Sequence, residues 1–181
     1  CIRDSYRTDS GRILIRCGTN WTDIATAQPR HILKLRDDTI GYVSQFLRVI
    51  PRISTLDLVI EAAAGSSAEP EAEARHLLHH LAIPERLWKL PPATFSGGEQ
   101  QRVNIARGFA ADRPLLFIDV PTASLDKSNR DSVLELVQEK RRRGTAILAI
   151  FHDADVREQL ADTVVDVTAF ATDETEAVIG H

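Results

Sequence analysis

Residues that can bind a phosphate or a metal occur in one glycine turn and directly after three apolar runs of this 181-residue chain. The glycine turn is Ser96-Gly97-Gly98-Glu99, in which Ser96 can cap a helix and Glu99 completes a capping box three residues later. Two glycines at a helix start let another molecule approach the free backbone N–H groups, where the helix dipole favours a phosphate. The turn therefore indicates contact with a phosphate-bearing ligand.

Each of the three apolar runs ends in a polar residue, and each is typical of a strand in a buried parallel sheet. The runs and the residues that follow them are 39–44 before Gln45, 114–118 before Asp119, and 145–151 before His152. Ligands of open α/β sheets lie beyond the carboxyl ends of the strands, so we expect these three polar side chains to meet at one sheet edge. An aspartate at such an edge is a candidate Mg²⁺ ligand.

Helical patterns cover most of the remaining chain. The turn at Ser96 opens a helix that we expect to reach about Ala111, and residues 46–110 as a whole read as a helical lobe. Further helices are predicted at 29–35, 54–63, 71–83, 128–143 and 153–161, with strands at 12–16, 21–27 and 163–167.

Two groups of polar residues admit a second interpretation. The spacing of His76, His79 and His80 suits a metal, but leucines occupy the opposite helix face, so a solvent-facing polar surface is favoured over a zinc site. The basic run 140–143 suggests nucleic-acid binding. Cations at a helix C-terminus with Gly144 just beyond are ordinary capping, which we favour.

Composition limits the class of protein. The net charge of −4 gives no reason to expect affinity for nucleic acid or a membrane surface. No apolar run approaches the roughly 20 residues of a membrane helix, so direct membrane insertion is not expected. The two cysteines, Cys1 and Cys17, form no disulfide framework, which favours a cytoplasmic location.

Four segments in order resemble the nucleotide-binding domain of ATP-binding-cassette (ABC) proteins: FSGGEQQR from Phe95, the strand LLFID, the loop PTASLD, and the histidine at 152. The resemblance extends from residue 11 onward. It implies an α/β fold with a P-loop NTPase-like parallel sheet, formed by residues 1–45 and 111–181. Residues 46–110 would form the helical subdomain that ends in the signature motif. Residues 21–36 and 41–52 most resemble PhnL, the ABC-type subunit of the carbon–phosphorus lyase system for phosphonate use.

The resemblance also implies ligands and partners. In the ABC family two such domains face each other and sandwich two ATP molecules, so ATP and Mg²⁺ are expected ligands. A second ABC-type subunit, identical or different, is the expected partner, together with other carbon–phosphorus lyase proteins.

Site residues carry over by their place in the motifs. The signature residues, which would contact the ATP held by the partner, are Ser96, Gly97, Gly98, Glu99 and Gln100. Ser124 and Asp126 would cross the dimer interface. Asp119 would hold Mg²⁺ indirectly, Gln45 would lie near the metal and the attacking water, and His152 would contact the γ-phosphate.

Two departures from the family pattern bear on catalysis. No segment supplies the GxxxxGK[ST] phosphate loop, and because the sequence starts at Cys1 and has no methionine, we interpret it as truncated ahead of that residue. Val120 stands where the family has the glutamate that polarises the attacking water, and loss of a general base costs about 10²–10⁴ in rate. We therefore expect no ATP hydrolysis by this chain alone, and an insoluble or molten protein when it is expressed alone.

Three interpretations stay open. The chain is an ABC ATPase subunit of phosphonate breakdown, a non-catalytic subunit that clamps a partner's nucleotide, or the ATPase subunit of a membrane exporter. Residues 41–52 favour the first, whereas Val120 favours the second.

Overall fold

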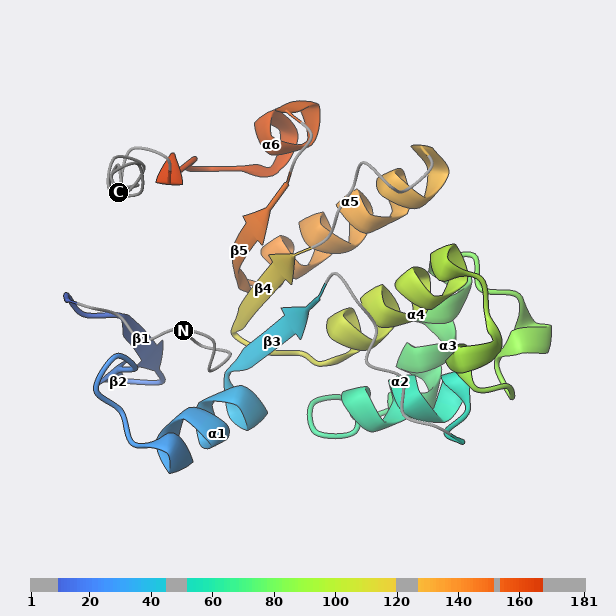
Figure 1. Cartoon of the computed structure of the whole chain (residues 1–181), viewed down its shortest axis with the longest axis horizontal. Coiled ribbons are helices and arrows are strands. Elements are labelled where there is room, and N and C mark those ends of the chain that lie inside the picture. The colour runs from blue at the N-terminus through green and yellow to red at the C-terminus, as the bar shows by residue number, and fades with distance from the viewer. Residues whose placement is uncertain (1–9, 45–51, 120–126, 152–153, 168–181) are drawn as a thin grey trace, which may run out of the picture.

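The computed structural model of the chain describes residues 10–44, 52–119, 127–151 and 154–167 (Figure 1). Near the N-terminus, β1 (Leu14–Cys17) and β2 (Asn20–Asp23) form an antiparallel hairpin in which Leu14 lies opposite Asp23. This pairing confirms that two strands lie there, but the second ends at Asp23 and does not reach the predicted residue 27. In Figure 1 the hairpin lies on one side of a central sheet, and the helices α2, α3 and α4 gather on the other.

The central sheet contains β3 (Ile40–Val43), β4 (Leu115–Asp119) and β5 (Ala146–Ile150), in that order. Both pairings are parallel. The register places Ile118 beside Val43 on one side and beside Ala149 on the other. The three apolar runs therefore form one parallel sheet, and their carboxyl ends share one edge, as predicted.

Helices occupy the predicted stretches to within a few residues. The bounds are α1 Pro29–Asp38, α2 Thr55–Ala63, α3 Pro70–His80, α4 Gly97–Ala110, α5 Lys127–Arg142 and α6 Ala154–Leu160, with short 3-10 helices η1 Glu85–Leu87 and η2 Pro92–Thr94. At the start of α2, the Ser54 hydroxyl accepts a hydrogen bond of 3.2 Å from the Asp57 N–H. Helix α3 ends before the predicted Ile83, because Ala82 takes a positive φ of 51°.

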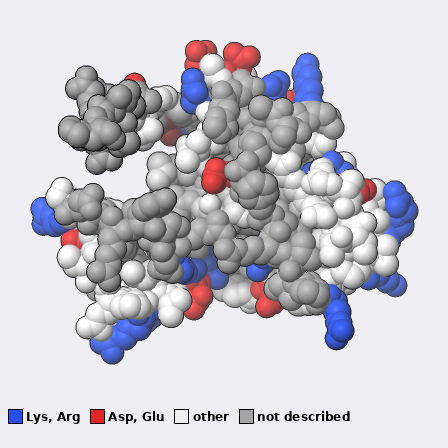
Figure 2. Space-filling view, in the orientation of Figure 1, with Lys and Arg blue, Asp and Glu red and all other residues white. Residues whose placement is uncertain are grey.

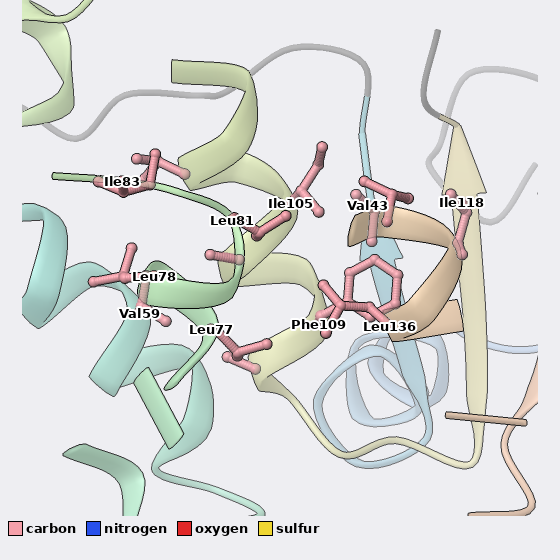
Figure 3. Packing of buried hydrophobic residues seen from close by; sticks show 14 of the residues in the cluster. Val43, Val59, Leu77, Leu78, Leu81, Ile83, Ile105, Phe109, Ile118 and Leu136 are labelled. Atoms are coloured by element: carbon pink, nitrogen blue, oxygen red, sulfur yellow. The ribbon is translucent and has the colours of Figure 1, made fainter. Parts of the chain in front are cut away.

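One hydrophobic cluster joins the helices to the sheet. The cluster contains side chains of α2, α3 and α4, among them Phe109, and continues to Val43, Ile118 and Leu136 (Figure 3). A smaller cluster, formed by Ile15, Ile24, Leu35 and Ile40, lies under the hairpin. Helix α4 is therefore fixed against the sheet along one face. The division into a core of 1–45 and 111–181 and a lobe of 46–110 stays a prediction.

The strand predicted at residues 163–167 is wrong. These residues adopt no strand conformation, and Val164, Val165 and Val167 are 66%, 64% and 72% exposed. Within the described residues no strand pairs with this segment, and a run of valines forms a strand only where another strand completes the backbone hydrogen bonds. Among the described helices, none is both long and apolar enough to cross a membrane.

Candidate nucleotide-binding site

The turn at Ser96 forms the predicted capping box at the start of α4. The Ser96 N–H donates to Glu99 Oε2 at 2.9 Å, and the Ser96 hydroxyl donates to the same oxygen at 2.7 Å. The Glu99 N–H donates in return to Ser96 Oγ at 3.4 Å. Two N–H groups of the first helical turn are thereby satisfied within the chain.

The glycines of this turn face open space. A Cβ atom added at Gly97 would meet nothing within 4 Å, and one added at Gly98 would meet only Arg102 Nη1, at 3.7 Å. Packing within the chain therefore does not require glycine at either position. What the glycines leave open is the approach to a helix N-terminus, next to an arginine, and this arrangement suits a phosphate from another molecule.

The capping box also sets the charge of Glu99. The hydrogen bond from the Ser96 side chain, then that from the Ser96 backbone, holds the pKa of the Glu99 carboxyl below its ordinary value of 4.5, and the charges of Arg102 and Arg86 act in the same direction. The carboxylate engages the hydroxyl that the family resemblance assigns to a phosphate. For Ser96 to donate to a phosphate, its hydroxyl would therefore have to give up its hydrogen bond to Glu99 Oε2.

Gln100, the last of the predicted signature contacts, is tied to the turn itself. Its side-chain amide donates to the Phe95 carbonyl at 3.0 Å. This bond bridges the residues on either side of the glycines. In the structure Gln100 therefore supports the shape of the turn.

Asp119 ends β4 at the sheet edge, as predicted, and its side chain is half-buried. The Tyr42 hydroxyl donates to Asp119 Oδ2 at 3.4 Å across the β3–β4 pair. The sequence pattern contained no sign of this tyrosine's role, because the contact depends on the register of two strands. The other residues predicted here lie outside the described residues: Gln45, Val120, Ser124, Asp126 and His152.

The histidines of α3 differ in their surroundings. His79 lies edge-on to Trp88, with ring centroids 4.7 Å apart, and is 3.2 Å from Glu85 Oε1. His80 is half-buried, and its Nε2 lies 3.1 Å from the Ser132 carbonyl oxygen of α5. The prediction that all three histidines point to solvent is therefore wrong for His80, because α5 packs over it.

Lys140, Arg141 and Arg143 of the basic run at the end of α5 each pair with a carboxylate of the chain. Lys140 is only 5% exposed, and its Nζ lies 2.9 Å from Asp112 Oδ1. Arg141 pairs with Asp162, and Arg143 with Glu139. On the face shown in Figure 2, the described lysines and arginines lie at several separate places, most of them at the margin, and do not gather in one patch.

A comparison with protein families identifies the family to which these residues belong. The profile described as "ABC transporter" matches residues 1–123. The chain belongs to the ABC transporter family.

Curated members of the family match the chain along most of its length. The macrolide export ATP-binding/permease protein MacB of Marinobacter nauticus is 37% identical over 140 residues, which are 76% of this chain and 22% of MacB. The lipoprotein-releasing system ATP-binding protein LolD 2 of Caulobacter vibrioides is 36% identical over 154 residues, 83% of this chain and 65% of LolD 2. The chain thus spans less than two thirds of either relative.

A solved ABC cassette has the same fold. The dimeric post-hydrolysis structure of the cassette MJ0796, bound to ADP and Pi, matches with a TM-score of 0.64 and 28% identity, covering 75% of this chain and 61% of that one. The fold is the α/β, P-loop NTPase-like fold of ABC ATPase cassettes, as the sequence predicted.

Proposed function

We propose that this chain is an ATP-binding-cassette subunit that contacts MgATP at an interface with a second cassette. The observation that carries the proposal is the exposed glycine turn at Gly97 and Gly98, which opens α4. An added Cβ atom would meet no described atom within 4 Å at Gly97 and only the end of the Arg102 side chain at Gly98. The MJ0796 cassette, a dimer with bound ADP and Pi, supports the same arrangement.

Two surfaces of the chain would meet two different nucleotides. Ser96 precedes Asn104 by eight residues, or about 12 Å of helix, and the Asn104 side chain donates to the carbonyl of Ser44, which directly follows β3. The glycine turn and the sheet edge are therefore separate surfaces. We assign the turn to the nucleotide held by the partner, and the edge at Asp119 to the chain's own side of the interface.

The remaining predicted site residues keep their proposed roles. Asp119 would hold Mg²⁺ through water, and its half-buried carboxylate is an oxygen ligand of the kind Mg²⁺ takes. Bound Mg²⁺ would neutralise part of the negative charge of the phosphates. Gln45 would lie near the metal and the attacking water, and His152 would contact the γ-phosphate. Ser124 and Asp126 would cross the interface. Because Val120 offers no general base, the proposal covers binding and dimerisation rather than hydrolysis.

The names of the relatives favour one class of partner. MacB and LolD 2 are named for macrolide export and lipoprotein release, so we propose that the second partner is a membrane permease, met from the cytoplasmic side. The alternative is a subunit of the carbon–phosphorus lyase system, which the sequence of residues 41–52 favours and the relatives' names do not. Affinity purification from the native cell separates the two: a co-purifying integral membrane protein supports the permease, and co-purifying soluble lyase subunits support the alternative.

The glycine turn provides the direct test of nucleotide contact. In the full protein as encoded by its gene, we expect MgATP to induce a dimer, seen by size-exclusion chromatography with light scattering. Gly97→Ala should abolish that dimer without lowering the melting temperature, because its added methyl group meets open space within the chain. Gly65→Ala is the matched control, since its Cβ would make only ordinary contact with Arg113 at 3.5 Å. A Gly97→Ala protein that dimerises like wild type would refute the assignment.

A further inference from the structure

A buried asparagine ties the signature helix to the sheet edge. Asn104 of α4 is 6% exposed, and its side-chain Nδ2 donates to the backbone carbonyl of Ser44. The same nitrogen lies 3.4 Å from Ser44 Oγ. Ser44 directly follows β3 and directly precedes Gln45 in the sequence. A buried amide of this kind is stable only where its hydrogen bonds are made.

One helical turn further on, α4 presses against the same strand. A Cβ atom added at Gly108 would lie 2.5 Å from Val43 Cγ2 and 3.2 Å from the Tyr42 carbonyl oxygen. The helix backbone and the strand therefore touch with no room between them. Tyr42 in turn reaches Asp119 through its hydroxyl. A continuous set of contacts thus runs from α4 through β3 to the sheet edge.

We propose that Asn104 is a positioning residue that transmits nucleotide contact from the glycine turn to the sheet edge. This inference rests on the proposed function, in which the turn meets the partner's nucleotide. Because α4 is one unbroken helix from Gly97 to Ala110, a displacement of its first turn also displaces Asn104. The Asn104–Ser44 bond then carries that displacement to the residue that directly follows β3.

Hydrogen–deuterium exchange of the full protein as encoded by its gene tests this coupling, with and without saturating MgATP. Two peptides are followed, one covering the turn at 96–100 and one covering 40–44. In wild type, MgATP should slow exchange in both. Asn104→Ala removes the amide, and Asn104→Asp keeps its shape but replaces the donor with an acceptor. In both variants we expect the slowing at the turn to persist and the slowing at 40–44 to fall about fivefold, the equivalent of one hydrogen bond.

Ile105→Val is the matched control, because Ile105 is the next residue of α4, fully buried, and forms no hydrogen bond through its side chain. This control should lower the melting temperature while leaving the MgATP effect at 40–44 intact. If the Asn104 variants acted only by destabilising the protein, the control would weaken that effect as well. Unchanged slowing at 40–44 in Asn104→Asp overturns the inference, as does an equal loss in Ile105→Val. Absence of any MgATP effect at the turn in wild type refutes the proposed function, and this inference with it.

Discussion

The Glu99 carboxylate makes the first turn of α4 sensitive to acid. Its pKa is lowered in the folded chain by the hydrogen bonds from Ser96, relative to an ordinary value of 4.5. A lowered carboxyl pKa stabilises the folded state at pH values above the ordinary value, and this stabilisation is lost as the pH falls from there through the folded pKa. Glu99→Gln should therefore be less stable than wild type at neutral pH and approach it in acid.

Urea unfolding across the acidic range measures that difference. Ser96→Ala removes the two hydrogen bonds between the Ser96 hydroxyl and Glu99 but leaves the bond donated by the Ser96 N–H, so its stability relative to wild type should show a weaker pH dependence of the same sign. Its loss of stability at neutral pH should be about 1 kcal/mol, which is typical of a missing N-cap. If the difference in unfolding free energy between wild type and Glu99→Gln stays constant with pH, the role of the capping box is contradicted.

Individual residues were predictable from the sequence where their contacts are local. The Ser96–Glu99 box follows from a spacing of three residues, and the end of β4 at Asp119 follows from an apolar run. The contacts of Tyr42 and Asn104 were not predictable, because they depend on strand register and on how closely a helix packs on a strand. The predicted meeting of Asp119 with Gln45 and His152 stays a prediction.

At the scale of elements, Gly108 sets how closely α4 approaches β3. Gly108→Ala would improve the helix propensity by about 1 kcal/mol. The added methyl group would, however, lie 2.5 Å from Val43 Cγ2, and overpacking of this kind costs about 1–3 kcal/mol. We expect a net loss of stability in chemical denaturation. Val43→Ala should offset that loss in the double variant, so that the two changes together cost less than their sum. Strict additivity would show that the strand moves aside freely.

The ion pair between the buried Lys140 and the exposed Asp112 links α5 to the segment between α4 and β4. The lysine side chain is 7% exposed and the aspartate side chain 49% exposed, while the Asp112 N–H donates to Ser66 Oγ at 2.8 Å. Asp112→Ala would leave a buried ammonium group without its partner, a loss of about 2 kcal/mol after allowance for the exposure of the aspartate. Lys140→Met should cost much less, because it removes the charge that has to be buried.

Urea unfolding measures the free energy of unfolding of the two single variants, and the Lys140→Met, Asp112→Ala double variant is the control. The double variant should be close to Lys140→Met alone. If Asp112→Ala proves as mild as Lys140→Met, the ammonium group reaches water in solution. The sequence predicted only a capping role for this lysine. Its ion pair with Asp112 was not predictable, because a run of like charges at a helix end does not reveal which of them faces a distant carboxylate.

At the scale of the whole molecule, β5 is one of the two outer strands of the described sheet and is uncharged. Leu148 and Ile150 on it are 61% and 59% exposed. An apolar outer strand with unpaired backbone groups promotes association between copies. For residues 1–181 expressed as printed, we expect concentration-dependent association in light scattering, and Leu148→Lys should reduce it. Leu33→Lys, at a position 57% exposed on α1, is the matched control and should have little effect. Equal effects of both changes would point to general surface hydrophobicity.

The pairing of β3 with β4 has a kinetic consequence. These neighbouring strands are separated in the sequence by α2, α3 and α4, which pack on one another. Contacts between distant residues form late, because the entropy of closing the intervening chain is lost before they form. We therefore expect the three helices to gain protection first in pulse-labelling hydrogen exchange during refolding, and the β3–β4 ladder last. The nascent helical unit would then serve as the template on which β3 docks, through Asn104 and Gly108, and the edge that carries Asp119 would be the last part of the molecule to form.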